Sequence, residues 1–260
     1  MITEETKIAV NLNGISKNFD NIQAVKNLNL QIKEGTVFGF LGPNGSGKST
    51  TMKMIMGLLK PDSGLLNVYG IDVLKQPWEI KKIVGYVPES PRLYEFLTGL
   101  EYLDFIADVY GITLESKKNL IDEYLSAFEL ENRENEMISG YSHGMKQKIA
   151  IIAALLHRPK LLILDEPLSG LDPKSAKIVK DLIHKLADEG VTTILSTHVL
   201  EIADAICDRI AIMYKGSKLA EGKPADLRRE SKMPDSSLEE IFLKLTGTNN
   251  IKAIVEALGK

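Results

Sequence analysis

The stretch Gly42-Pro43-Asn44-Gly45-Ser46-Gly47-Lys48-Ser49-Thr50 decides the fold of this chain. The apolar run 37–41 before it predicts a buried strand, and residues 52–59 after it carry apolar side chains at the spacing of one helical face. Glycines between a strand and a helix let backbone N–H groups approach phosphate oxygens, and the helix directs its positive end at the same anion. The pattern predicts a phosphate-binding loop, in which Lys48 reaches the β- and γ-phosphates and the Ser49 hydroxyl binds Mg²⁺.

Composition is that of an ordinary globular protein. The chain has 260 residues, 44% of them hydrophobic, and a formal net charge of −3, which is compatible with a soluble protein that buries a substantial core. The charge gives no overall basic surface for nucleic acid or for an anionic membrane. We therefore expect no nucleic-acid partner, although a local basic patch stays open.

The cysteine and the apolar segments give expectations about where in the cell the protein is found. The single cysteine, Cys207, has no metal-ligand spacing around it, so we expect a buried thiol in a reducing compartment. Residues 1–7 are polar and acidic, which predicts no signal peptide. The most apolar windows, 149–156 and 161–164, are shorter than the roughly 18 residues of a membrane span. Any association with a membrane would therefore come through a partner.

Before the phosphate-binding loop, alternating patterns predict strands at 7–13 and 24–32. Phe19 lies between them among polar neighbours, and an aromatic residue in such a loop could stack on an adenine ring or cover the edge of the core. After the loop, residues 65–69 and 84–87 are further predicted strands.

From residue 98 to about 128 the pattern becomes helical. Thr98 and Glu101 form a capping-box pattern, and an apolar stripe follows at 120–128. We expect a helical insertion between strands of an α/β core. A polar loop then leads into an apolar helix at 149–156, and Ser142 and Gly144 at its start could hold a phosphate or only cap the helix.

A second acidic motif follows the apolar strand 161–164, which ends at Asp165-Glu166-Pro167. Two adjacent carboxylates there would be unfavourable to bury without a cation, and Mg²⁺ is the cation of a nucleotide site. Asp165 would hold the metal. Glu166, on the other side of the extended chain, would orient and deprotonate a water molecule. Two surface acids that only end a strand are the alternative.

The remaining pattern completes the core. Residues 173–187 predict a helix, and the strand 191–196 ends at Thr197-His198. Since open α/β sheets place their sites at the ends of parallel strands, we expect a functional role for His198. A hairpin is predicted at 209–213 and 218–221, and two helices at 238–245 and 251–258, which pack on the parent domain or contact a partner.

In this order, the motifs resemble those of the ATP-binding subunit of ABC transporters over residues 5–225. The resemblance implies an α/β fold: a P-loop NTPase core with a RecA-like mixed, mostly parallel sheet and flanking helices, an antiparallel β edge and an α-helical insert. It implies an ATP-binding domain at 1–228, with the insert at about 90–157, and a C-terminal helical tail at 229–260. The implied cofactors are ATP and Mg²⁺.

The resemblance also implies roles for individual residues. Residues 42–50 would bind ATP, Phe19 would stack on adenine, and Glu166 and His198 would be catalytic, His198 as the switch histidine that senses the γ-phosphate. Glu89 occupies the position of a usual glutamine and would join Ser49 and Asp165 at the metal. The signature residues Ser142 and Gly144 would contact the ATP of a partner subunit, and Asp172 would belong to an inter-subunit loop.

Two departures specify the branch. Residues 141–145 read Tyr-Ser-His-Gly-Met where the usual signature is Leu-Ser-Gly-Gly-Gln, and glutamate stands at 89. Both variants, and the stretch 238–243, resemble exporters whose separate permease is a compact six-helix membrane protein. One phosphate loop and one signature per chain would require two copies, as a homodimer or heterodimer. The implied place is cytoplasmic, on the inner face of the cell membrane through the permease.

Other functions remain open from the sequence. A soluble ABC ATPase without a transport role has a similar core, although neither long coiled-coil insertions nor tandem ATP domains are present. A non-hydrolysing ATP-binding regulatory module and an importer subunit are further alternatives.

Overall fold

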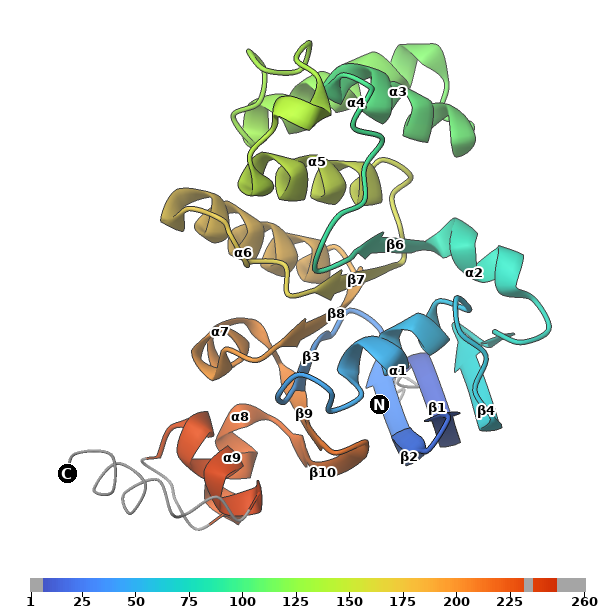
Figure 1. The fold of residues 1–260 in the computed structure, drawn as a ribbon, viewed down its shortest axis with the longest axis vertical. Helices are drawn as coiled ribbons and strands as arrows, with labels where there is room; N and C mark the ends of the chain where they lie inside the picture. The colour runs from blue at the N-terminus through green and yellow to red at the C-terminus, as the bar shows by residue number, and fades with distance from the viewer. Residues whose placement is uncertain (1–6, 232–235, 247–260) are drawn as a thin grey trace, which may run out of the picture.

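The computed structural model describes residues 7–231 and 236–246. The described strands form two sheets, and helices cover the larger one (Figure 1). The larger, six-stranded sheet has the order β10-β9-β3-β8-β7-β6, and the smaller, four-stranded sheet has the order β2-β1-β4-β5. This is the predicted α/β architecture with an antiparallel edge.

Neighbours in the larger sheet from β9 to β6 run parallel, and β10 pairs antiparallel with β9. The strands are β3 (Val37–Leu41), β6 (Val84–Val87), β7 (Leu161–Asp165), β8 (Thr192–Thr197), β9 (Arg209–Tyr214) and β10 (Ser217–Gly222). Every residue of β3, β7 and β8 is buried. The apolar sequences of β3 and of residues 161–164 predict this burial, whereas β8 buries threonine and serine hydroxyls beside Ile194 and Leu195. Because β3, β8 and β7 are adjacent and parallel, their carboxyl ends meet at one edge of the sheet.

The smaller sheet is antiparallel and contains β1 (Ile8–Phe19), β2 (Ile22–Lys33), β4 (Ser63–Val68) and β5 (Ile71–Asp72). β1 and β2 extend further than predicted, through several shifts of register. Phe19 is the last residue of β1 and pairs with Ile22, so its predicted place in a loop is wrong. The polar residues around it are outward-facing strand positions and a short turn, which single-sequence alternation does not separate from a loop.

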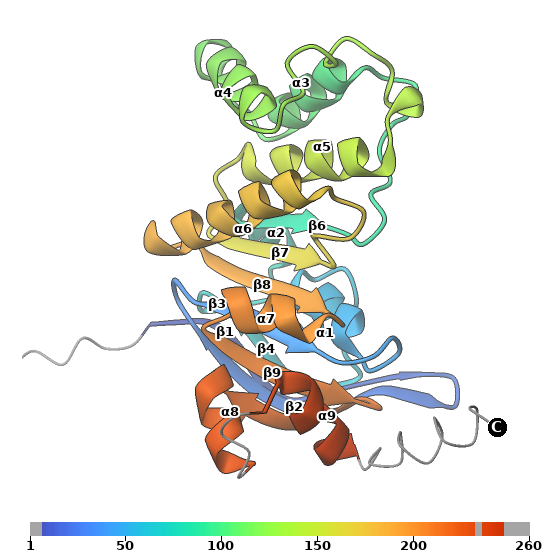
Figure 2. The same cartoon turned by 90° about the vertical axis from the view of Figure 1, so that its left-hand side faces the viewer.

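The helix α1 (Lys48–Ile55) packs between the two sheets, and its Met52, Met54 and Ile55 are fully buried. These two methionines are therefore core residues. The opposite face of the larger sheet is covered by α5 (His143–Leu155), α6 (Pro173–Asp188) and α7 (Leu200–Ile206), which share a second core (Figure 2).

Helices α3 (Gly99–Val109) and α4 (Leu114–Ala127) lie beside α5, at the end of the molecule away from the smaller sheet (Figures 1 and 2). The predicted capping box at α3 is confirmed: Glu101 N donates to Thr98 Oγ1 at 3.2 Å, and Thr98 N donates to Glu101 Oε2 at 2.8 Å. A 3₁₀ turn, η1 (Ile138–Gly140), precedes α5. The short helix α2 (Pro77–Ile83) was not predicted.

At the C-terminal end, α8 (Pro224–Glu230) and α9 (Leu238–Thr246) pack together, and α9 also contacts α7. The predicted helix at 238–245 is therefore confirmed, whereas the one at 251–258 lies outside the described residues. Cys207 is buried, and burial raises the pKa of its thiol, as expected for an inert core cysteine.

Candidate active site

The stretch 42–50 links the end of β3 to the start of α1, as predicted. Two of its glycines are required by close approach: a Cβ on Gly42 would lie 2.1 Å from Met213 O, and one on Gly47, whose φ is 104°, would lie 2.5 Å from Ala24 O. The turn after β9 holds the loop from outside, since Gly216 N donates to Ser46 O at 3.1 Å and Lys26 N to Gly216 O at 2.8 Å. The loop is thus shaped by both sheets.

One polar side chain of this loop is without a hydrogen-bond partner in the described part of the chain, and a phosphate oxygen could provide one. The Oγ of Ser46 is buried and has no hydrogen-bond partner among the described residues. A cavity of about 190 Å³ is lined by residues 44–50 together with Glu89. Backbone N–H groups at a helix start and an orphaned hydroxyl form a cradle that fits phosphate oxygens.

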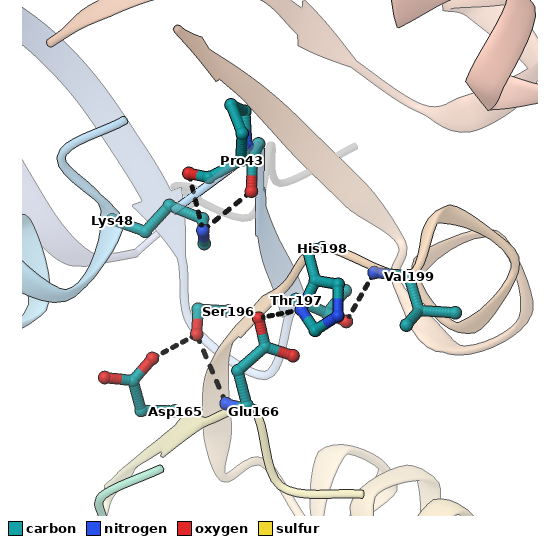
Figure 3. Close-up of polar contacts among 9 residues, drawn as sticks. Pro43, Lys48, Asp165, Glu166, Ser196, Thr197, His198 and Val199 are labelled. Atoms are coloured by element: carbon teal, nitrogen blue, oxygen red, sulfur yellow. Dashed lines mark hydrogen bonds and ion pairs between the residues drawn. The ribbon is translucent and has the colours of Figure 1, made fainter. Parts of the chain in front are cut away.

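Lys48 is nearly buried, and its ammonium points back at the loop. Its Nζ donates to Gly42 O at 2.7 Å and to Pro43 O at 3.2 Å (Figure 3). Burial lowers the pKa of Lys48, while the negative charges of Glu166, Asp165 and Glu89 oppose that shift. These three carboxylates therefore act on the same ammonium, although they come from distant parts of the sequence.

The acidic motif ends β7 beside β8. Asp165 pairs in register with Ser196, whose Oγ donates to Asp165 Oδ1. The same Ser196 accepts from the Glu166 backbone, since Glu166 N lies 3.2 Å from both the carbonyl oxygen and the Oγ of Ser196 (Figure 3). One serine thus fixes both acidic residues relative to the neighbouring strand.

Glu166 does not continue the strand, so the prediction that it lies on the other side of an extended chain is wrong. Its φ is 49°, in the left-handed region. Such a backbone is unfavourable for a residue with a side chain and persists where its surroundings hold it. Here the bonds to Ser196 and the following turn, closed by Ser169 N to Glu166 O at 3.1 Å, hold it.

His198 meets Glu166 across the strand ends. Its Nδ1 lies 2.8 Å from Glu166 Oε1, and with a proton on Nδ1 the imidazole donates to the carboxylate (Figure 3). The Glu166 side chain is 8% exposed and the His198 side chain 57% exposed. A nearly buried carboxylate thus has one partner that opens to solvent, at the edge where β3, β7 and β8 end.

Other predicted site residues lie apart from this cluster. Ser142 and Gly144 begin α5, which β6 and β7 separate from α1 (Figures 1 and 2). Asp172 caps α6, where Oδ1 accepts from the N–H groups of Lys174 and Ser175 at 3.0 Å each. Phe19 is 45% exposed beside Lys17, whose Nζ lies 5.6 Å from the ring centroid.

The model of the ABC transporter family matches residues 25–169, which is more than half of the chain. The chain belongs to this family. The matched segment runs from β2, through the phosphate-binding loop, to the turn after Glu166. Among the described residues of this cassette, no helix is both long and apolar enough to cross a membrane.

Curated relatives belong to the ATP-binding subunits of transporters. The cassette is 41% identical over 213 residues to the bacitracin transport ATP-binding protein BcrA of Bacillus licheniformis, covering 82% of this chain and 68% of that protein. It is 36% identical over 228 residues to the daunorubicin/doxorubicin resistance ATP-binding protein DrrA of Streptomyces peucetius, covering 88% and 69%.

A solved structure carries the same fold and a nucleotide. It is the dimeric, post-hydrolysis state of the ATP-binding cassette MJ0796 bound to ADP and Pi, at 30% identity and a TM-score of 0.76, covering 82% of this chain and 98% of that one. The fold class is therefore that of the ABC cassette, and the family is one of ATP-hydrolysing proteins.

Two polar residues that touch the acidic motif of this cassette were not predicted from the sequence. Ser196 holds both Asp165 and Glu166. Gln147, which is 0% exposed, donates from Nε2 to Pro167 O at 3.3 Å. A hydroxyl near the end of a predicted buried strand, and an amide among the apolar positions of a helix, were the available signals.

Proposed function

We propose that this cassette is the ATP-hydrolysing subunit of a transporter, that it works as a dimer around two ATP molecules, and that it powers export through a separate membrane permease. The observation that carries the proposal is the nearly buried Glu166 carboxylate, 2.8 Å from His198, beside a complete phosphate-binding loop. Membership of the ABC family and the transport and resistance relatives support it.

In the proposed complex, residues 42–50 hold the phosphates of ATP. Lys48 exchanges its two carbonyl partners for phosphate oxygens, and the orphaned Ser46 hydroxyl and the loop N–H groups bind others. Phe19, an exposed aromatic residue at the end of β1, stacks on adenine.

Ser49, Asp165 and Glu89 would hold Mg²⁺, which would neutralise charge that develops on the phosphate oxygens. Glu89 lines the same cavity as Ser49. The part of the chain that the structure describes contains no cluster of three His, Cys, Asp or Glu residues suited to a metal. This donor set fits Mg²⁺, because Mg²⁺ takes one or two carboxylates together with substrate phosphates rather than a cage of protein ligands.

Glu166 acts as the general base for the attacking water, and His198 keeps its carboxylate in place. A hydrogen bond from His198 Nδ1 leaves the other carboxylate oxygen available to accept a proton from water. His198 is open to solvent on its other side, which allows it to contact the γ-phosphate of a bound nucleotide.

Two copies are needed for a complete site. In the ribbon, β6 and β7 lie between α5 and α1 (Figures 1 and 2), which supports a role for Ser142 and Gly144, at the start of α5, on the ATP of a second subunit. Asp172, in the loop that follows the acidic motif, completes the contact between subunits. The dimeric MJ0796 cassette supports this arrangement. The structure is compatible with a homodimer and a heterodimer.

The permease docks on a groove between the helical insert, residues 90–157, and the core. A cavity of about 320 Å³ is lined by Tyr86 of β6, Tyr102 and Ile106 of α3, and residues of α5. Exposed aromatic rings continue it: Tyr94 lies 6.1 Å from Tyr102 and 5.9 Å from Phe96, which is 72% exposed. Such a patch is typical of a protein interface. This contact would place the cassette on the inner face of the cell membrane.

The test is to tag the chain in its native cell, solubilise the membranes in mild detergent and identify bound proteins by mass spectrometry. We expect a stoichiometric polytopic membrane protein without its own phosphate-binding loop. A Phe96→Asp variant should lose this partner while it keeps its ATPase activity, because Phe96 lies outside the cluster around Glu166. A set of soluble partners alone would contradict the transporter proposal and leave the ATPase assignment intact.

A further inference from the structure

Gln147 occupies a place that stability alone does not explain. It lies in the second turn of α5, is 0% exposed, and uses Nε2 to donate to Pro167 O at 3.3 Å. Its Oε1 is buried and has no hydrogen-bond partner in the described part of the chain. A buried amide that is only half satisfied destabilises a fold relative to an apolar side chain of the same size. We therefore look for a role of Gln147 in function rather than in stability.

The group that Gln147 contacts is the turn that carries Glu166. Pro167 follows Glu166 directly, and Glu166 has a φ of 49°. Residues before proline are already restricted, so this backbone needs support from several sides. Ser196 supplies that support from β8, through two contacts with Glu166 N at 3.2 Å. Gln147 contacts the same turn from α5.

A second contact joins the same two segments. A Cβ on Gly170 would lie 2.3 Å from His143 Cδ2, and one on Gly144 would lie 3.1 Å from Gly170 O. Thus the first turn of α5 packs against the loop that follows Glu166, at a distance that leaves no room for a methyl group on Gly170. Between Pro167 and Gly170, this loop and the start of α5 behave as one packed unit.

We propose that Gln147 is a positioning residue for hydrolysis: its hydrogen bond to Pro167 O ties the Glu166 turn to α5, so that the carboxylate takes its working position only when α5 is in place. The inference rests on the proposed function, in which Glu166 is the base and the start of α5 binds the partner's ATP. Gln147 would then couple two ATP sites: the position of Glu166, the base for the ATP of its own subunit, would depend on α5, whose start contacts the ATP of the partner subunit.

The decisive variant is Gln147→Met, which keeps the length and burial of the side chain and removes the donor. We expect kcat to fall about tenfold or more, since small displacements of a catalytic group have effects of this size, while KM and the ATP dissociation constant stay within about twofold. The matched control is Lys146→Met on the same helix, where Lys146 pairs instead with Glu95 at 2.6 Å. Its kcat should equal that of the wild type.

A readout without nucleotide separates positioning from a general loss of packing. Hydrogen exchange of the nucleotide-free chain should show faster exchange at residues 166–171 in Gln147→Met, with unchanged exchange at the start of α5 and a melting temperature that does not fall. Equal loosening of α5 would assign Gln147 a structural role only and overturn the proposal.

A conservative variant provides a second test. In Gln147→Glu, a protonated carboxyl can donate to Pro167 O and an ionised one repels it. We expect kcat relative to the wild type to rise as the pH falls, because burial favours the neutral acid. A flat ratio, together with wild-type kcat in Gln147→Met, overturns the inference. Unchanged turnover in Glu166→Gln would instead contradict the proposed function itself, so the two failures are distinguishable.

Discussion

The strand-end cluster around Glu166 and the start of α5 differ in where their polar groups find partners. At the strand ends, Lys48 bonds to the loop backbone, Asp165 to the Ser196 hydroxyl and Glu166 to His198, so these side chains find their partners in distant parts of the same chain. At the start of α5, Ser142 is exposed, and its Oγ accepts from Met145 N in the same helix at 3.3 Å. The first region is assembled within one chain, whereas the second presents an exposed helix N-terminus that its own serine caps.

The largest expected effect concerns the first region alone. Glu166→Gln keeps the size of the side chain and removes the base, so we expect turnover to fall by about 10²- to 10⁴-fold. ATP affinity should be retained, and an ATP-stabilised dimer should become visible by size-exclusion chromatography. Phosphate release at the wild-type rate would show that Glu166 is not the base and that the strand-end cluster does not carry out the chemistry proposed for it.

Lys48→Ala should weaken ATP binding itself. The variant removes a nearly buried ammonium that faces the loop, and a hydrogen bond to a charged group contributes about 1.5–3 kcal/mol. We therefore expect the dissociation constant for ATP to rise roughly tenfold to a hundredfold in calorimetry. The exposed Lys53 on the same helix provides the control, since Lys53→Ala should bind ATP as the wild type does. Undiminished affinity in Lys48→Ala would contradict the phosphate-loop assignment.

Ser142→Asp tests whether the start of α5 binds the ATP of the partner subunit. Aspartate caps a helix as well as serine does, so the melting temperature should change little. The added negative charge should oppose the partner's phosphates and weaken the ATP-stabilised dimer by about tenfold or more, without a change in the ATP affinity of the monomer. A loss of affinity in the monomer would place Ser142 at its own chain's nucleotide and contradict the division between the regions.

The smallest effect concerns the link between the regions, at Asp172. The hydroxyl and the N–H group of Ser175 hold the pKa of this carboxyl at about 2, below its usual 3.8. The folded-state pKa is depressed, so the stabilisation is present above about pH 4 and is lost as the pH falls towards 2. Asparagine caps the helix without titrating, so the melting temperatures of the wild type and Asp172→Asn should converge over this range. Parallel curves would show that Asp172 does not stabilise α6 through its charge.

Much of the fold could be predicted because its central strands have distinctive sequences. β3 and residues 161–164 of β7 are short apolar runs, which identifies strands buried on both faces, and β8 is rich in β-branched residues. α2 and β5 could not be predicted in this way, since seven and two residues give too little periodicity. The length of β1 and β2 was underestimated because register shifts interrupt their alternation.

The candidate site divides along similar lines. Lys48, Asp165 and Glu166 follow from local motifs, whereas the place of Ser196, which bonds to both Asp165 and Glu166, depends on a strand pairing that one sequence does not reveal. The left-handed conformation of Glu166 was missed because the tertiary contacts of Ser196 and Gln147 enforce it against the preference of the residue. Long-range hydrogen bonds, rather than local propensity, thus set the geometry of the acidic motif.

The position of β3 in the sheet affects how the protein folds during its synthesis on the ribosome. β3 is residues 37–41, yet its two neighbours in the sheet are β8 and β9, at 192–197 and 209–214, and Gly216 bonds to the loop that follows β3. The phosphate-binding motif is therefore synthesised early, but the strands and the turn that pack around it are synthesised only after most of the chain. We expect nascent chains stalled before residue 192 to remain sensitive to protease around residues 42–50 even with ATP present. Protection at that length would show that the loop forms without its neighbours.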